Sequence, residues 1–145
     1  MRTHWAASLF LLVVAVVSTV ANPSVVNLVV GVFLVALALV IAPLTGALLF
    51  PRSVTSAQAV QASQQDGRPI IYWRPGCPFC LRLRATVRAE ASKALWVNIW
   101  DDPEGAAAVR AVADGNETVP TVVWGSDVHV NPDPEWVRAR LTSAP

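Results

Sequence analysis

The only two cysteines of this sequence stand three positions apart, in the motif C-P-F-C that runs from Cys77 to Cys80. Thiol–disulfide exchange requires a thiolate that is exposed, stabilised and free to attack in line. A short turn, residues 74–76, precedes Cys77, and Pro78 favours the first turn of a helix. A helix N-terminus stabilises negative charge, so the spacing predicts Cys77 as the nucleophile. Cys80, nearly one turn further and shielded inside the helix, is the predicted resolving thiol.

Two other uses of the cysteine pair have less support. A tetrahedral zinc site needs about four ligands, whereas the polar part of the chain offers two thiols and one histidine, His129. No metal site is therefore expected. A structural disulfide between such close neighbours would close a very small loop and contribute little stability.

A second candidate motif is Thr118-Val119-Pro120, which stands just before an apolar run. A proline in front of a buried strand is unusual unless its peptide bond is cis and makes a tight bend. Such a bend would leave the backbone of Val119 free to pair with a peptide-like thiol. Alone, the motif is also compatible with the simple start of a strand. With C-P-F-C upstream, it predicts a thiol-binding groove.

The elements that must position these motifs lie in residues 68–145, which indicate one α/β domain. Strands are expected at 69–73, 95–100, 121–124 and 127–130, the last two forming a hairpin. Helices are expected at 78–92, 103–113 and 134–141, with acids at the start of the second. A right-handed crossover would make the first two strands parallel. The order predicts a four-stranded mixed sheet with flanking helices.

The first 52 residues have a different composition, with no acidic residue and only Arg2 and Arg52 as basic ones. Two uncharged apolar runs, 5–21 and 25–42, flank a short N-P-S turn, and the second can continue to residue 50. They are apolar on every face, which predicts a transmembrane hairpin in residues 1–52, with spans at about 5–21 and 25–50. Residues 53–67, rich in Ala, Ser and Gln, are predicted to be a linker: a flexible tether or a short helix that ends at Gly67.

The charges predict location and partners. Basic residues at both ends of the hairpin and an uncharged turn place both termini in the cytoplasm, which makes this a multi-pass cell-membrane protein with a cytoplasmic redox domain. Cleavage of the first run as a signal peptide is the alternative, and it leaves the domain on the same side. Residues 53–145 carry all ten acidic and nine basic residues, a net charge of −1. This balance gives no indication of nucleic-acid binding.

With these residues placed, the domain resembles the glutaredoxin branch of the thioredoxin superfamily, and within it the actinobacterial mycoredoxins, which work with mycothiol. The resemblance covers about residues 69–142, and the hairpin lies outside the common family pattern. It rests on C-P-F-C after a strand ending in Y-W, on V-N-I-W-D-D-P at 97–103, on D-G-N-E-T-V-P-T-V-V at 114–123 and on N-P at 131–132.

The resemblance implies a thioredoxin fold, a cis Pro120, Cys77 as the nucleophile and an enzyme of the thiol–disulfide oxidoreductase type. Phe79 stands where glutaredoxins commonly carry tyrosine. The glycine pair that many of them place after the last strand is replaced by N-P-D from Asn131 onward, which favours mycothiol over glutathione. The implied thiol-binding residues are Arg74, Phe79, Thr118, Val119, Pro120 and Asn131.

The expected function is reduction of mixed disulfides between mycothiol and protein thiols at the cytoplasmic membrane face. Its expected partners are a low-molecular-weight thiol as co-substrate, protein mixed disulfides and the membrane, with no permanently bound cofactor. Two alternatives stay open. One is an iron–sulfur or metal-binding module in which Cys77 and a small thiol hold a cluster between two chains. The other is an electron relay to a membrane partner.

Overall fold

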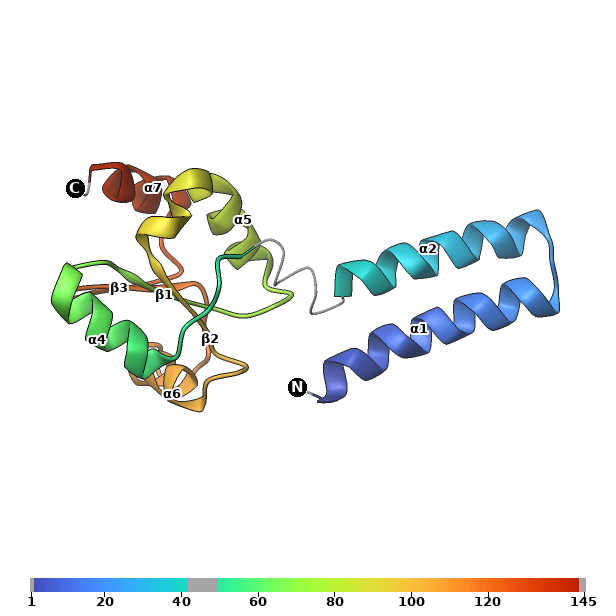
Figure 1. The fold of residues 1–145 in the computed structure, drawn as a ribbon, viewed down its shortest axis with the longest axis horizontal. Helices are drawn as coiled ribbons and strands as arrows, with labels where there is room; N and C mark the ends of the chain where they lie inside the picture. Colours follow the sequence, from blue (N-terminus) through green and yellow to red (C-terminus); the bar gives the residue numbers. More distant parts are fainter. Residues whose placement is uncertain (1, 42–49, 144–145) are drawn as a thin grey trace. The chain divides into compact units, whose positions relative to one another are not determined.

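A computed structural model describes residues 2–41 and 50–143 of the protein. The chain forms two compact units, Met1–Leu48 and Leu49–Pro145. In the described part of the first unit, residues 2–41, the regular structure is helical, and the second unit contains a sheet with helices on both of its faces (Figure 1).

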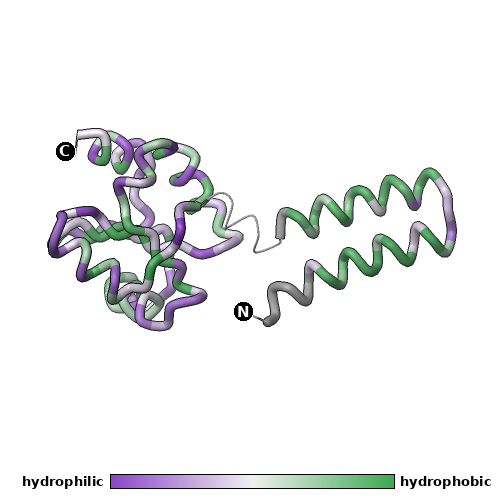
Figure 2. The backbone as a smooth tube through the Cα atoms, in the orientation of Figure 1, coloured by the Kyte–Doolittle hydropathy of each residue, from purple (hydrophilic) through white to green (hydrophobic). Residues whose placement is uncertain are grey.

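The first unit is an antiparallel pair of helices, α1 (Arg2–Ala21) and α2 (Val25–Ile41). Asn27, the strongly polar residue of the second apolar run, closes the turn between them, because its Nδ2 donates to Asn22 O at 2.7 Å. The helices approach closely at Gly31, where a Cβ atom would lie 2.8 Å from Thr19 Oγ1. Most of the large apolar side chains described in this unit are exposed. Figure 2 shows that hydrophobic residues, in green, make up most of both helices.

The membrane predictions need correction. Within residues 2–41 and 50–143, no helix is both long and apolar enough to cross a membrane. α2 has 17 residues, and at about 1.5 Å per residue it rises roughly 26 Å, less than a hydrocarbon core of about 30 Å. The uncharged part of α1, residues 5–21, is equally short. The predicted two membrane spans and the multi-pass membrane localisation are therefore wrong. The predicted continuation of the second run through Pro43 lies outside the described residues.

The second unit is built on a four-stranded mixed sheet, which confirms the predicted α/β architecture. Its strands lie in the order β2-β1-β3-β4. β1 pairs with β2 in parallel and with β3 antiparallel, and β3 and β4 form the antiparallel hairpin. The strand bounds are β1 Ile70–Trp73, β2 Leu95–Asn98, β3 Thr121–Trp124 and β4 Asp127–Val130.

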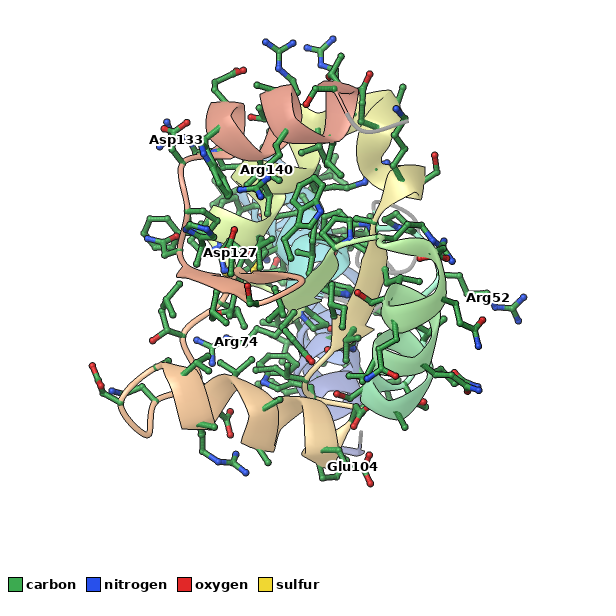
Figure 3. All side chains as sticks on the ribbon, turned by 90° about the vertical axis from the view of Figure 1, so that its left-hand side faces the viewer. Arg52, Arg74, Glu104, Asp127, Asp133 and Arg140 are labelled. Atoms are coloured by element: carbon green, nitrogen blue, oxygen red, sulfur yellow. The ribbon has the colours of Figure 1, made fainter. Side chains whose placement is uncertain are left out.

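Helices cover both faces of this sheet (Figures 1 and 3). α5 (Pro78–Val87), a short 3-10 helix η1 (Arg88–Lys93) and α7 (Pro134–Ser143) pack together on one face. α4 (Ser56–Asp66) and α6 (Pro103–Val112) lie on the other. Apolar side chains that are fully buried fill the space between helices and sheet, among them Ile71, Leu83, Val97, Val109, Val122 and Leu141.

The helix that follows Cys77 is shorter than predicted. A single helix over 78–92 was expected, but α5 ends at Val87, and Arg88, the first residue of η1, adopts a φ of 43°. The break fits the packing of Trp96, which is buried and whose Nε1 donates to Ala91 O at 2.8 Å. An indole donor that is removed from water needs such an acceptor, and the tighter 3-10 turn supplies it.

Residues 53–67 contain α4, so the helical alternative for this segment is the one observed. Thr55 caps the helix in a reciprocal capping box with Gln58, and Gly67 ends it with a φ of 74°. The left-handed conformation at the C-cap is one that glycine adopts without steric cost. Ala59 of α4 is fully buried in the core of the second unit.

Candidate active site

Cys77 is the N-cap residue of α5, as the sequence predicts. Its Sγ accepts a hydrogen bond from the Cys80 backbone N–H at 3.3 Å. The same thiol donates to Val119 O, also at 3.3 Å. An N-cap acceptor lies at the positive end of the helix, where the unpaired N–H groups favour negative charge. The Cys77 sulfur therefore has a partner for both of its states: a carbonyl for the thiol and an amide for the thiolate.

Cys80 lies in a different environment. Its side chain is fully buried in the core. Burial is the largest cause that raises the pKa of the Cys80 thiol far above its ordinary value, and the hydrogen bond with Cys77 adds to it. A backbone hydrogen bond from Arg74 and the Arg74 charge oppose this rise in the pKa. Cys80 consequently stays protonated at neutral pH, and the two cysteines have distinct chemical roles.

The loop opposite Cys77 has the bend that the sequence predicts. The Val119–Pro120 peptide bond is cis. Two hydrogen bonds hold this loop: Thr121 Oγ1 donates to Thr118 O at 2.7 Å, and the Asn131 backbone N–H donates to Pro120 O at 2.8 Å. The first links the loop to β3 and the second links it to the residue after β4. The hairpin thereby presents Val119 to the cysteine.

Asn131 adopts a φ of 48°, a left-handed conformation that asparagine tolerates better than most non-glycine residues. The backbone at this position therefore has a conformation that a glycine would also supply. In contrast to glycine, Asn131 carries a carboxamide, and this exposed residue is joined through its backbone N–H to Pro120 O.

The predicted site residues come together to different degrees. Cys77, Cys80 and Val119 are joined by hydrogen bonds, and Thr118, Pro120 and Asn131 belong to the same loop system. Phe79 shares the first turn of α5 with the cysteines, and this residue is 55% exposed.

Arg74 precedes the motif and is half-buried. In the view of Figure 3 its side chain lies between α6 and the hairpin that carries Asp127. Among the described residues its guanidinium forms no ion pair.

Sequence reasoning missed one residue of the site, Thr121. Its side chain is fully buried, and its hydroxyl secures the Thr118 carbonyl. A signal existed, because a threonine inside an apolar run needs a partner for its hydroxyl once it is buried. The sequence could not show that this partner is the backbone of the predicted groove.

Comparison with known proteins supports the same kind of site. Residues 70–130 match the family model described as Glutaredoxin. This range runs from β1 to β4 and includes both cysteines and Pro120. Searches of curated proteins and of solved structures gave no significant match. Together with the mixed sheet, the family match supports a glutaredoxin-like thiol–disulfide oxidoreductase.

Proposed function

We propose that this protein, which carries a glutaredoxin domain at residues 70–130, reduces mixed disulfides between protein thiols and a low-molecular-weight thiol, with mycothiol as co-substrate. The observation that carries the proposal is the setting of Cys77. Its Sγ caps α5 through the Cys80 amide and lies 3.3 Å from the Val119 carbonyl. A helix N-terminus favours negative charge, and a thiolate formed there lies beside the Val119 backbone, where we place the small thiol.

The reaction begins with attack of the Cys77 thiolate on the small-thiol sulfur of the mixed disulfide. A Cys77–thiol disulfide forms, and the protein thiolate leaves and takes up a proton. A second molecule of the small thiol, as thiolate, then attacks this new disulfide. It releases Cys77 and forms the symmetrical small-thiol disulfide. One mixed disulfide and one small thiol thus give one protein thiol and one symmetrical small-thiol disulfide: the incoming thiol is oxidised and the protein sulfur is reduced.

Cys80 offers a second route. It can attack the Cys77–thiol disulfide, which releases the small thiol and leaves a Cys77–Cys80 disulfide that an external dithiol must reduce. Burial raises the pKa of Cys80, so this attack first requires removal of its proton in an apolar environment. The monothiol route therefore dominates when the small thiol is abundant.

The groove supplies partners for the bound thiol. Val119 O accepts from the Cys77 thiol, and loss of that proton frees the carbonyl to accept from an amide of the substrate, as between neighbouring strands. The unpaired Arg74 guanidinium can bind an anionic or hydroxyl group. The exposed carboxamide of Asn131 can bond the hydroxyl groups of a sugar-based thiol such as mycothiol.

A turnover assay with mycothiol and glutathione mixed disulfides of one protein tests the proposal. We expect faster turnover of the mycothiol form. Cys77→Ser should abolish turnover, whereas Cys80→Ser should keep much of it, because the second small thiol resolves the intermediate. Equal loss from both substitutions would establish a dithiol mechanism instead. Preference for glutathione would contradict mycothiol as the co-substrate, and a brown protein from anaerobic purification would favour the cluster-binding alternative.

A further inference from the structure

Residues that precede the matched glutaredoxin region pack against β1, the strand that leads to Cys77. Residues 50–56, which we call the clasp, run from Phe50 to the first residue of α4. The Phe50 ring is 6% exposed and stacks on Trp73, with ring centroids 3.8 Å apart and an angle of 6° between the planes. It also meets Trp96 edge to face at 5.5 Å. Trp73 Nε1 donates to Ser53 Oγ at 3.1 Å.

The clasp crosses the outer edge of the sheet. β2 is an edge strand, and its Trp96 O accepts from Val54 N at 2.9 Å. In the β1–β2 register Ile71 pairs with Trp96, so Trp73 and Trp96 lie on one face and Tyr72 on the other. Phe50 therefore packs on the face of the two tryptophans. Ser56, whose Oγ lies 3.3 Å from the Tyr72 hydroxyl oxygen, packs on the opposite face.

Trp73 connects the clasp to the reaction site. It is the last residue of β1, and only the three-residue turn 74–76 separates it from Cys77. Its backbone O accepts from Ile99 N at 3.0 Å, while its indole has Phe50 on one face and Ser53 at its nitrogen. The next residue, Arg74, lies close enough to Cys80 for its backbone and its charge to lower the pKa of that thiol. A shift of Trp73 would therefore displace the turn that leads to Cys77 and the arginine that lies near Cys80.

We propose that Phe50 and Ser53 are positioning residues for thiol–disulfide exchange, which act through Trp73 to hold the turn before Cys77 in its reactive geometry. Within the described part of the chain, the ring contacts of Phe50 and the side-chain hydrogen bond of Ser53 are with Trp73 and Trp96 and do not involve Val119. The clasp should therefore influence the rate of the chemical step more than the binding of the small thiol, since small displacements of reacting atoms strongly reduce rates. The turnover part of this proposal rests on the proposed function, whereas the conformational part does not.

The test compares Phe50→Leu with Val109→Ala in the full chain. Phe50→Leu keeps apolar bulk and removes the stack, and Phe50→Tyr is the rescue because it keeps an aromatic ring. Val109 is fully buried on α6, on the face of the sheet away from the two tryptophans, so Val109→Ala lowers global stability without touching the clasp. Both variants are measured under conditions of equal global stability.

Two readouts are recorded: amide hydrogen exchange at Arg74 and Cys80, and kcat and KM for a mixed disulfide. We expect Phe50→Leu to speed hydrogen exchange at these amides by about tenfold or more relative to Val109→Ala. It should lower kcat by a similar factor and leave KM within about twofold of the wild-type value. Phe50→Tyr should restore both the exchange rates and kcat. Unchanged exchange at Arg74 and Cys80, or equal effects in Val109→Ala, would overturn the positioning role. Faster exchange in a protein whose wild type shows no turnover would uphold the conformational role and refute the proposed function instead.

Discussion

At the scale of single residues, Cys77 and Cys80 differ because their surroundings differ. The Cys77 sulfur caps α5 and has a carbonyl and an amide as partners. The Cys80 side chain lies in the core, where burial raises its pKa. A nucleophile needs a stabilised thiolate, while a resolving thiol can remain protonated until the intermediate has formed. The two cysteines of one short motif thus have different chemical roles, Cys77 as the nucleophile and Cys80 as the resolving thiol.

The raised pKa of Cys80 predicts a loss of stability at alkaline pH. The folded protein keeps a proton that the unfolded chain releases above the ordinary thiol pKa of 9.0. The stability that depends on protonated Cys80 is complete below about pH 9 and declines as the pH rises further, by up to about 1.4 kcal/mol per pH unit for one proton. Urea unfolding of the wild type and Cys80→Ala, from about pH 7 to about pH 10, measures this. Parallel curves for the two proteins would assign the loss to other groups.

Thr121 gives a second prediction at this scale. Thr121→Val keeps the side-chain shape and removes the hydroxyl that donates to Thr118 O, which should cost about 1–3 kcal/mol of stability. The loosened groove should raise KM for the mixed disulfide by about threefold or more, whereas iodoacetamide should still alkylate Cys77. Thr121→Ser retains the hydroxyl and is the matched control. A Thr121→Val enzyme with the KM of the wild type would refute a role for this bond in the groove.

At the scale of elements, Asp102 caps two helices at once. Its Oδ1 accepts from Gly105 N at 2.9 Å at the start of α6, and its Oδ2 accepts from Ser56 N at the start of α4. The carboxylate is buried, so its loss leaves both N–H groups without a partner and away from water.

Asp102→Ala should therefore destabilise the second unit by about 2–4 kcal/mol, the sum of two such losses. Thr55→Ala, which removes the single exposed cap of α4, should cost about 1 kcal/mol. Chemical denaturation of the two variants measures both values. Equal costs would mean that Asp102 supports one helix only.

The sequence predicted best those helix and strand ends that are marked by residues at or next to the end itself. The bounds of β3 and β4 agree with the predicted strands, because turn residues mark both ends of the hairpin. The start of α5 is marked by Pro78. Its end was not predictable, since Arg88 is neither glycine nor proline and the break depends on Trp96, which comes from another element.

The candidate site shows the same division. Cys77, Cys80 and Pro120 belong to short motifs whose chemistry can be recognised from residue type and spacing. The roles of Thr121 and Phe50 depend on contacts across the sheet, which only the fold creates. Phe50 also follows a long apolar run. The sequence therefore favoured its assignment to the predicted second span, and gave no indication that it packs against a tryptophan of the domain. The clasp was therefore not visible in the sequence.

At the scale of the whole molecule, the redox unit is larger than the region that matches the glutaredoxin family. The match begins at residue 70, whereas the second compact unit begins at Leu49. The additional residues include the clasp and α4, which bring Phe50 and Ala59 into the core of the unit. They also provide one hydrogen bond to the edge strand β2, from Val54 N to Trp96 O, and so satisfy one backbone group on an edge that is open to pairing.

Shortened chains should reveal this boundary. A chain that starts at residue 50 keeps the clasp contacts that the structure describes and should unfold at the same urea concentration as the second unit of the full chain. A chain that starts at residue 68 loses the Phe50 ring, α4 and the hydrogen bonds of Val54 and Ser56.

Burial of one large apolar side chain contributes about 1.5–3 kcal/mol, so the shorter chain should lose more than about 3 kcal/mol. Its unfolding should also show a smaller dependence on urea, because less surface becomes exposed. Circular dichroism during urea titration measures both quantities. If the two shortened chains unfold at the same urea concentration, the clasp and α4 only lie on the domain and contribute nothing to its stability.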